Sequence, residues 1–230
     1  MIIEAFKKFS VASWILLSLF LVSCVIQLTF AFLEKEKYRR IEKPFCLGLL
    51  TAFAAVTLPN HPMIYIATFL GMLGDILVIL PNKKAFYVGA FCFFSGFVLY
   101  ALEGLLILMG GNVPIYMIVV IITTYVVMVF ALIFLVGLRI AKHKGEAIGI
   151  GLYLSPLFTL VVIMCFLTAK GGGVMYLSLI GTLFFLFSDC LITFTKFVKK
   201  FKRYDFYVMG SYLIAQLLIV IGYTLTYLIR

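Results

Sequence analysis

Long apolar runs, separated by short polar or glycine- and proline-containing connections, constrain this chain more than any other feature. A helix that crosses a bilayer needs about 20 mostly apolar residues. By that criterion the sequence predicts eight transmembrane helices in one domain, residues 1–230. The predicted ranges are 11–33, 44–58, 63–80, 85–109, 114–138, 147–168, 174–195 and 206–229. We therefore expect an all-α integral membrane protein, folded as a bundle of eight helices.

The ends of these runs carry residues that commonly begin or end helices. Lys43-Pro44 opens the short second run, and a proline in the first turn of a helix loses no hydrogen bond. Pro59 and Pro62 follow its other end. The first run is too long for the apolar part of a signal peptide and lacks a cleavage pattern, so we expect it to remain as a helix.

The composition excludes an ordinary soluble domain. Hydrophobic residues make up 65% of the chain and charged residues 12%, against about 45–50% and about 25% in soluble domains. The net charge of +10 does not indicate nucleic-acid binding, because the basic residues cluster between apolar runs. The five cysteines all lie within apolar runs and form no CxxC motif. This pattern predicts buried thiols and neither a disulfide nor a metal site.

The distribution of lysine and arginine predicts the orientation in the membrane, because cytoplasmic connections carry a positive excess. Four basic residues belong to one side: Lys7, Lys8, Lys170 and Arg230. The others follow the first, third, fifth and seventh runs: Lys35, Lys37, Arg39, Arg40, Lys43, Lys83, Lys84, Arg139, Lys142, Lys144, Lys196, Lys199, Lys200, Lys202 and Arg203. We therefore expect both termini on the non-cytoplasmic side and the basic loops in the cytoplasm. His61 and His143 then lie on opposite sides and cannot share a metal ion.

Three acidic residues lie within the predicted spans: Asp75, Glu103 and Asp189. An ionisable side chain inside a membrane costs at least ~2.5–3.5 kcal/mol, which makes each a candidate functional residue. The structural alternative is an interhelical hydrogen bond or a pairing with a loop lysine. Asp75 precedes Lys83 by eight positions and Asp189 precedes Lys196 by seven. Both carboxyls are therefore predicted at matching depth, roughly 10–12 Å from the cytoplasmic lysines.

The two aspartate helices also share a local pattern. One contains LGDILVI and the other FSDCLIT, and the helices that follow them begin with FYVG at 86–89 and FYVMG at 206–210. A spacing of four helices makes such halves parallel in the membrane. The sequence thus suggests a parallel repeat of four plus four helices, with an accidental likeness as the alternative.

Small and polar residues follow one face of four predicted helices, since positions three and four apart stack on the same side. The stripes are Ser178, Gly181, Thr182, Phe185 and Asp189; Thr68, Gly71 and Asp75; Gly96, Tyr100 and Glu103; and Tyr212 with Gln216. Small residues alone would indicate close helix packing. The additional carboxyls, glutamine and tyrosines favour a polar cavity within the bundle.

Several of these residues make the chain resemble the lysoplasmalogenase (YhhN) family. The similarity extends from about residue 43 to the C-terminus, and it rests on KP at 43–44, G-x-x-G-D at 71–75, FSD at 187–189 and YVMGSYLIAQLLIV at 207–220. One position departs from the family pattern. Members commonly carry H-x-x-Y in the fourth helix, and here Phe97 occupies the histidine position before Tyr100. Glu103, one turn beyond Tyr100, is a candidate substitute for the missing ionisable group.

The resemblance implies hydrolysis of the vinyl ether bond of lysoplasmalogens, which yields a fatty aldehyde and glycerophosphoethanolamine or glycerophosphocholine. This reaction needs an acid that protonates the β-carbon and a carboxylate that stabilises the cation and orients water. Burial in a low-dielectric bundle favours the neutral form of a carboxyl. We assign Asp75 and Asp189 to the catalytic pair, without distinguishing which is the acid.

Other residues are predicted to bind or orient the substrate: Tyr100, Glu103, Ser188, Tyr212 and Gln216. Lys43, at the start of the second predicted helix, is expected to bind the lipid phosphate with help from the helix dipole. The alternative for Lys43 is a lysine that extends to the membrane surface. No sequence feature demands a metal or another cofactor, and a G-x-S-x-G nucleophile motif is absent. The expected partners are a lysophospholipid substrate and membrane lipids; the oligomeric state is not determined.

Two other functions stay open at this point. In a transporter or channel, Asp75 and Asp189 would bind a cation or relay protons. Broken helices at mid-membrane would favour transport, yet the prolines cluster at span ends, except Pro156. The third alternative is an inactive family member that binds lipid without turnover, for which Phe97 is the reason.

Overall fold

The computed structural model describes residues 2–110, 126, 144–170, 173–197, 199 and 201–229. All regular elements in these ranges are α-helices. Their bounds are α1 (Ile2–Lys7), α2 (Val11–Phe32), α3 (Glu36–Thr57), α4 (Pro62–Ile79), α5 (Lys83–Met109), α7 (Lys144–Ala169), α8 (Met175–Phe197) and α9 (Tyr204–Ile229). The predicted span 114–138 lies outside the described residues, apart from residue 126.

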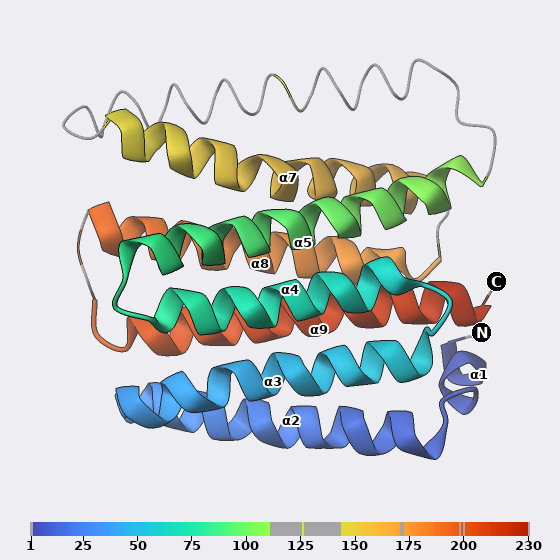
Figure 1. The fold of residues 1–230 in the computed structure, drawn as a ribbon. Helices are drawn as coiled ribbons and strands as arrows, with labels where there is room; N and C mark the ends of the chain where they lie inside the picture. Colours follow the sequence, from blue (N-terminus) through green and yellow to red (C-terminus); the bar gives the residue numbers. More distant parts are fainter. Residues whose placement is uncertain are drawn as a thin grey trace.

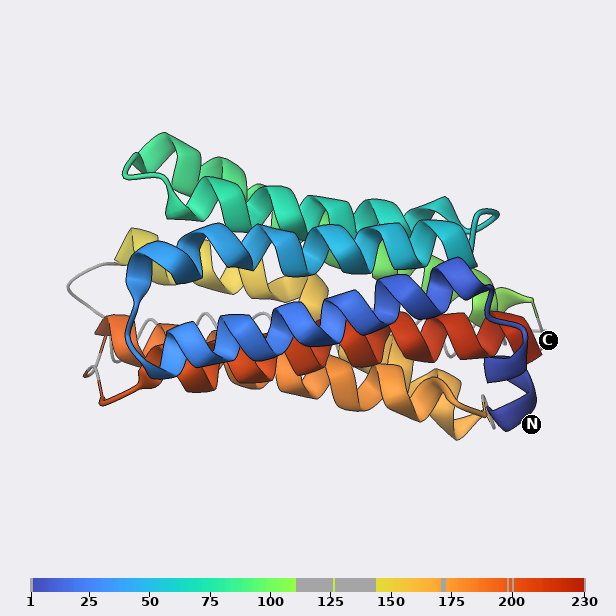
Figure 2. The same cartoon turned by 90° about the horizontal axis from the view of Figure 1, so that it is seen from below.

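Seven of these helices run lengthwise side by side (Figures 1 and 2), and their contacts close a ring. Going around the ring, α2 contacts α3, and α4, α5, α7, α8 and α9 follow in order until α9 returns to α2. The short α1 packs against α9 at the end of the bundle where both termini lie, here named the termini end (Figure 1). The α2–α3 and α4–α5 connections lie at the opposite end, as do the end of α8 and the start of α9. Because the ring closes, the inward face of each helix meets other protein segments.

The surfaces of the helices show which solvent surrounds the bundle. Among the helices that the structure describes, five are long and apolar enough to cross a membrane: α2, α4, α5, α8 and α9. Large apolar side chains such as Val11, Val25 and Phe91 are exposed on the outside, while Phe20 and Phe53 are fully buried. An outer surface of this kind is stable in lipid and not in water. The protein is therefore an integral membrane protein with a helical bundle.

The prediction for the second helix was wrong at its start. The sequence pattern placed the beginning at Pro44, but α3 begins at Glu36, so Pro44 lies inside the helix. Hydropathy detects only the apolar part of a helix, whereas the first two turns of α3 are polar and include an exposed ion pair between Glu36 and Arg40. Lys43 consequently lies two turns from the helix start, where the helix dipole no longer assists anion binding. The other described long helices begin and end within three residues of the predicted bounds.

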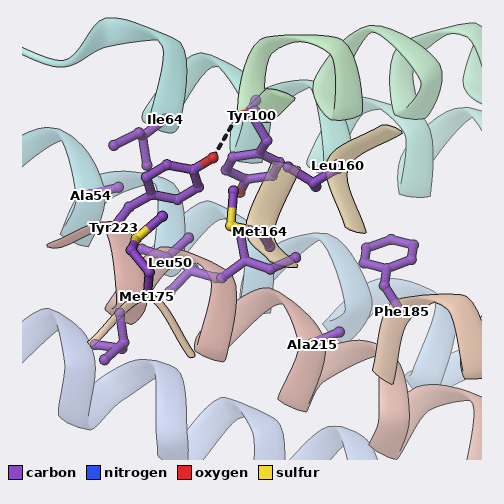
Figure 3. Packing of buried hydrophobic residues seen from close by; sticks show 14 of the residues in the cluster. Leu50, Ala54, Ile64, Tyr100, Leu160, Met164, Met175, Phe185, Ala215 and Tyr223 are labelled. Carbon is purple, nitrogen blue, oxygen red and sulfur yellow. Dashed lines mark hydrogen bonds between the residues drawn. The ribbon is translucent and has the colours of Figure 1, made fainter. Parts of the chain in front are cut away.

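Small residues on the inward faces allow the helices to approach closely. A Cβ on Gly96 would lie 3.0 Å from the carbonyl oxygen of Ala67, and one on Gly181 would lie 2.8 Å from the backbone nitrogen of Ile219. Between them the core is filled by large side chains, among them Tyr100 and Phe185 (Figure 3). The residues of the predicted small and polar stripes are all buried; the polar cavity inferred from them stays a prediction.

Candidate active site

A buried ion pair connects α3 and α4 in the half of the bundle away from the termini. The Nζ atom of Lys43 lies 2.7 Å from Oδ1 of Asp75, whose side chain is 0% exposed. The Tyr212 hydroxyl on α9 donates a hydrogen bond of 2.8 Å to the other carboxylate oxygen, Oδ2. The ammonium of Lys43 also lies 5.1 Å from the centre of the Tyr212 ring, within the range of a cation–π contact. Three helices thus meet at one carboxylate.

The second carboxylate, Asp189 on α8, is buried beside this pair. It forms a side-chain hydrogen bond with Tyr153 of α7 and interacts electrostatically with Lys43. Its Oδ2 atom is buried and has no hydrogen-bond partner in the described part of the chain. Lys43 therefore acts on both carboxylates, and the two belong to one polar cluster.

Aromatic rings surround this cluster within the ring of helices. Phe185 contacts the Tyr212 ring edge to face with centroids 5.3 Å apart, and it contacts Phe97 at 4.7 Å. Phe97 in turn lies 6.3 Å from the Tyr153 ring. These aromatic side walls lower the polarity around the cluster, which strengthens the interactions among the charges.

The polar contacts continue along α9 towards the termini end. Gln216 forms a side-chain hydrogen bond with Tyr212 and accepts one of 3.4 Å from the Tyr100 hydroxyl. Closer to the termini end of α9, the Tyr223 hydroxyl donates a hydrogen bond to the backbone carbonyl of Tyr100 (Figure 3). Tyr212, Gln216 and Tyr223 share the inward face of α9, since their spacings are four and seven residues. Gln216 thus links Tyr100 to Tyr212, which itself contacts Asp75.

The sequence of the chain matches one protein family over most of its length. The family model described as the YhhN family matches residues 38–223, which is most of the chain. The chain belongs to the YhhN family. This is the lysoplasmalogenase family, so the resemblance inferred from the sequence is confirmed. No curated protein and no solved structure matches the chain.

Two glycines of the YhhN-like G-x-x-G-D segment explain how Asp75 reaches its position. A Cβ on Gly71 would lie 2.9 Å from the Leu47 side chain and 3.5 Å from Nε2 of Gln216. A Cβ on Gly74 would lie 2.7 Å from the Phe93 ring. A side chain at either position would require the Leu47 side chain or the Phe93 ring to move. In this YhhN protein the motif therefore serves close approach as well as carrying the acid.

The structure brings together most, but not all, of the residues proposed from the sequence. Lys43, Asp75, Asp189 and Tyr212 form the cluster, and Gln216 and Tyr100 adjoin it through Tyr212. Ser188 is buried and donates to the carbonyl of Val208 at 3.2 Å, a contact that joins α8 to α9. Glu103 lies towards the termini end and contacts His61 and Tyr227. Neither Ser188 nor Glu103 is placed among the contacts of the two aspartates.

Two groups near the cluster were not singled out from the sequence. Tyr153, the hydrogen-bond partner of Asp189, is one tyrosine in a long apolar run, and no local pattern distinguishes it. Glu42 accepts a hydrogen bond of 2.6 Å from Ser23, and Ser23 also contacts Cys46 at 3.2 Å. Glu42 lies in the polar start of α3, which the apolar runs do not predict as helix. Its position next to Lys43 in the sequence is the signal that could have identified Glu42.

The chemistry available to this arrangement is proton transfer and charge stabilisation. Two carboxylates, one ammonium and two phenol hydroxyls are buried together, and such groups serve as general acids, general bases and counter-charges. In the described ranges, no three His, Cys, Asp or Glu side chains are grouped in a way that could hold a metal ion.

Proposed function

We propose that this YhhN protein hydrolyses the vinyl ether bond of lysoplasmalogens within the membrane, using Asp75 and Asp189 as the catalytic pair. The observation that carries the proposal is the buried Lys43–Asp75 ion pair beside Asp189, in a member of the lysoplasmalogenase family. An ion pair and a second carboxylate inside a bundle are costly for stability alone, which favours a functional reason for them.

The different partners of the two carboxylates suggest their roles. Asp75 has a cation at 2.7 Å and a hydroxyl donor at 2.8 Å, and both favour the ionised form. Asp189 has one carboxylate oxygen without a hydrogen-bond partner in the described part of the protein, so a proton can reside there. We therefore assign Asp189 as the acid and Asp75 as the carboxylate that stabilises positive charge. Tyr153 and Tyr212 hold these two side chains in place.

The proposed reaction proceeds in three steps with balanced protons. Asp189 transfers its proton to the β-carbon of the vinyl ether, and the α-carbon becomes an oxocarbenium ion whose charge Asp75 stabilises. Water then adds to the α-carbon and loses a proton to a carboxylate, which gives a hemiacetal. The hemiacetal collapses when its hydroxyl proton passes to the ether oxygen. The products are the fatty aldehyde and glycerophosphoethanolamine or glycerophosphocholine.

The placement of the cluster also suggests where the substrate enters. Asp75 and Asp189 lie near the ends of α4 and α8 that are away from the termini, where α3 begins with Lys37, Arg39 and Arg40. We take this end as cytoplasmic, because it carries the basic residues, with both termini on the other side. The lysolipid headgroup then remains among the basic residues while its vinyl ether extends to the cluster. Eight membrane spans and a parallel repeat of four plus four helices belong to the same proposal.

The experiment that tests this function measures product from two substrates. Purified protein in detergent is given lysoplasmalogen or an ester-linked lysophospholipid, and aldehyde and fatty acid are quantified. We expect aldehyde from the first lipid only, and a loss of at least 100-fold in Asp75→Asn and in Asp189→Asn, in line with acid–base catalysis of about 10²–10⁴-fold.

The matched control is Asp205→Asn, because Asp205 is a carboxylate on α9 that pairs with Arg39 outside the cluster. This variant should keep its aldehyde release. An absence of aldehyde from the wild-type protein, or full activity in either cluster variant, would refute the proposal. Ion-dependent uptake into vesicles without turnover would indicate a transporter instead.

A further inference from the structure

A second polar cluster lies at the termini end of the bundle. Glu103 on α5 is buried, and its Oε1 atom accepts hydrogen bonds from two donors. One donor is Nδ1 of His61, the residue that precedes α4, at 3.0 Å; the other is the Tyr227 hydroxyl on α9. The rings of His61 and Tyr227 are stacked, with centroids 3.5 Å apart. Three elements thus present one carboxylate and two rings to the same place.

This cluster forms one side of a cavity of about 370 Å³. The other lining residues include Asn60, Met63 and Leu106. His61 is 30% exposed in its side chain, whereas Glu103 is 4% exposed, so the carboxylate lies at the inner end of the group. A volume of this size falls in the range of about 300–1,000 Å³ that small-molecule sites occupy.

The cavity is separate from the aspartate cluster. Tyr212 contacts Asp75, and Tyr227 contacts Glu103, on the same helix α9. The offset between the two tyrosines in sequence corresponds to about 22 Å along the helix axis. A ligand in the cavity would therefore not touch the proposed catalytic pair.

The charges around the cavity indicate what it would bind. Glu103 is an acid lining it, and no lysine or arginine is among the described lining residues. Lys8 contacts the carbonyl of Leu228 at the end of α9 and does not line the cavity. A buried carboxylate in apolar surroundings attracts a cation, and an adjacent tyrosine ring adds a cation–π contact.

We propose that this cavity binds a small organic ammonium ion, with Glu103 as the counter-charge and Tyr227 as the aromatic wall. The ammonium can belong to a free amine or to the headgroup of a lipid in the adjacent leaflet, since both present the same chemistry. The site does not depend on the proposed hydrolase function.

The test measures ammonium binding to the full chain in detergent. Ethanolamine and tetramethylammonium chlorides are titrated by calorimetry, with sodium chloride at equal ionic strength as the control. We expect saturable binding in the wild type and at least tenfold weaker binding in Glu103→Gln, because the glutamine oxygen still accepts both hydrogen bonds but carries no charge. Asp189→Asn should bind as the wild type does, which keeps this result independent of the aspartate cluster.

A second variant covers the case in which Glu103→Gln does not fold. Met63→Lys introduces an ammonium at a partly exposed position that lines the cavity. The lysine side chain should pair with Glu103 and so abolish binding of an added ammonium ion. Wild-type protein in nanodiscs that contain phosphatidylethanolamine should lose the response to added ethanolamine if the source is a lipid headgroup. In phosphatidylglycerol nanodiscs the response should persist. No binding to the wild type, or unchanged binding in Glu103→Gln and Met63→Lys, would overturn the proposal and leave a purely structural contact.

Discussion

Replacing Lys43 by methionine tests whether the fold depends on the charge balance of the buried cluster. Methionine keeps most of the length and the apolar contacts of the lysine stem but removes the ammonium. The ion partner, Asp75, is 0% exposed and lies 2.7 Å from the lost nitrogen. The variant therefore leaves a carboxylate buried with only the Tyr212 hydroxyl to stabilise it.

The expected magnitude follows from the burial of the two partners. Breaking a buried ion pair by removing one partner costs about 3–5 kcal/mol. The Lys43 side chain is 17% exposed, so its ammonium is partly solvated. The expected cost therefore lies at the lower end of this range. We expect a loss of about 3 kcal/mol in the free energy of unfolding. Adding Asp75→Asn should recover about 2 kcal/mol, because the remaining group is neutral.

The measurement is a double-mutant cycle on protein in mixed micelles, with unfolding by SDS followed by circular dichroism. The control is Arg40→Met on the same helix, which breaks the exposed Arg40–Glu36 pair, 48% and 61% exposed. Such a surface pair contributes less than about 1 kcal/mol. If Lys43→Met costs the same free energy in the wild type as in the Asp75→Asn variant, the ion pair does not stabilise the fold, and the reasoning fails.

Two further predictions concern the packing and the interface between helices. Gly181→Ala should lower the free energy of unfolding by about 1–3 kcal/mol, because its Cβ would lie 2.8 Å from a backbone nitrogen of α9. The control is Gly110→Ala, whose Cβ would have no atom closer than 3.6 Å. This variant should be nearly neutral in the same unfolding assay. Arg39→Ala removes the 2.5 Å pair with Asp205, whose side chains are 16% and 26% exposed, and should cost about 1–2 kcal/mol. That loss should shrink in high salt, and salt-independent destabilisation would contradict the assignment.

The apolar runs predicted the described helices well, since a membrane span is a local property of sequence. α2, α4, α5, α8 and α9 follow directly from the lengths of their runs. The start of α3 was missed because Glu36 to Lys43 form a polar helical segment, and hydropathy cannot separate such a segment from a loop. The buried faces were also predictable, because Asp75 and Asp189 share their helical face with small residues.

The contacts of the acids were less predictable. Glu103 was grouped with Tyr100 by helical spacing, and both are indeed buried on α5. The two residues are less than one helical turn apart, yet Tyr100 contacts Gln216 and Glu103 contacts His61 and Tyr227. Neighbouring positions on one stripe can therefore contact different partner residues and belong to different sites.

The sequence by itself determined that this chain belongs in a membrane and that three acids must be buried there, because both follow from the solvent preference of local segments. The tertiary structure alone decided which partner each acid has: Lys43 for Asp75, Tyr153 for Asp189 and His61 for Glu103. The physical reason is that these partners lie on other helices or in the connections between them. Which helices become neighbours is set by packing around the closed ring, and no local pattern of apolar and polar residues records that order.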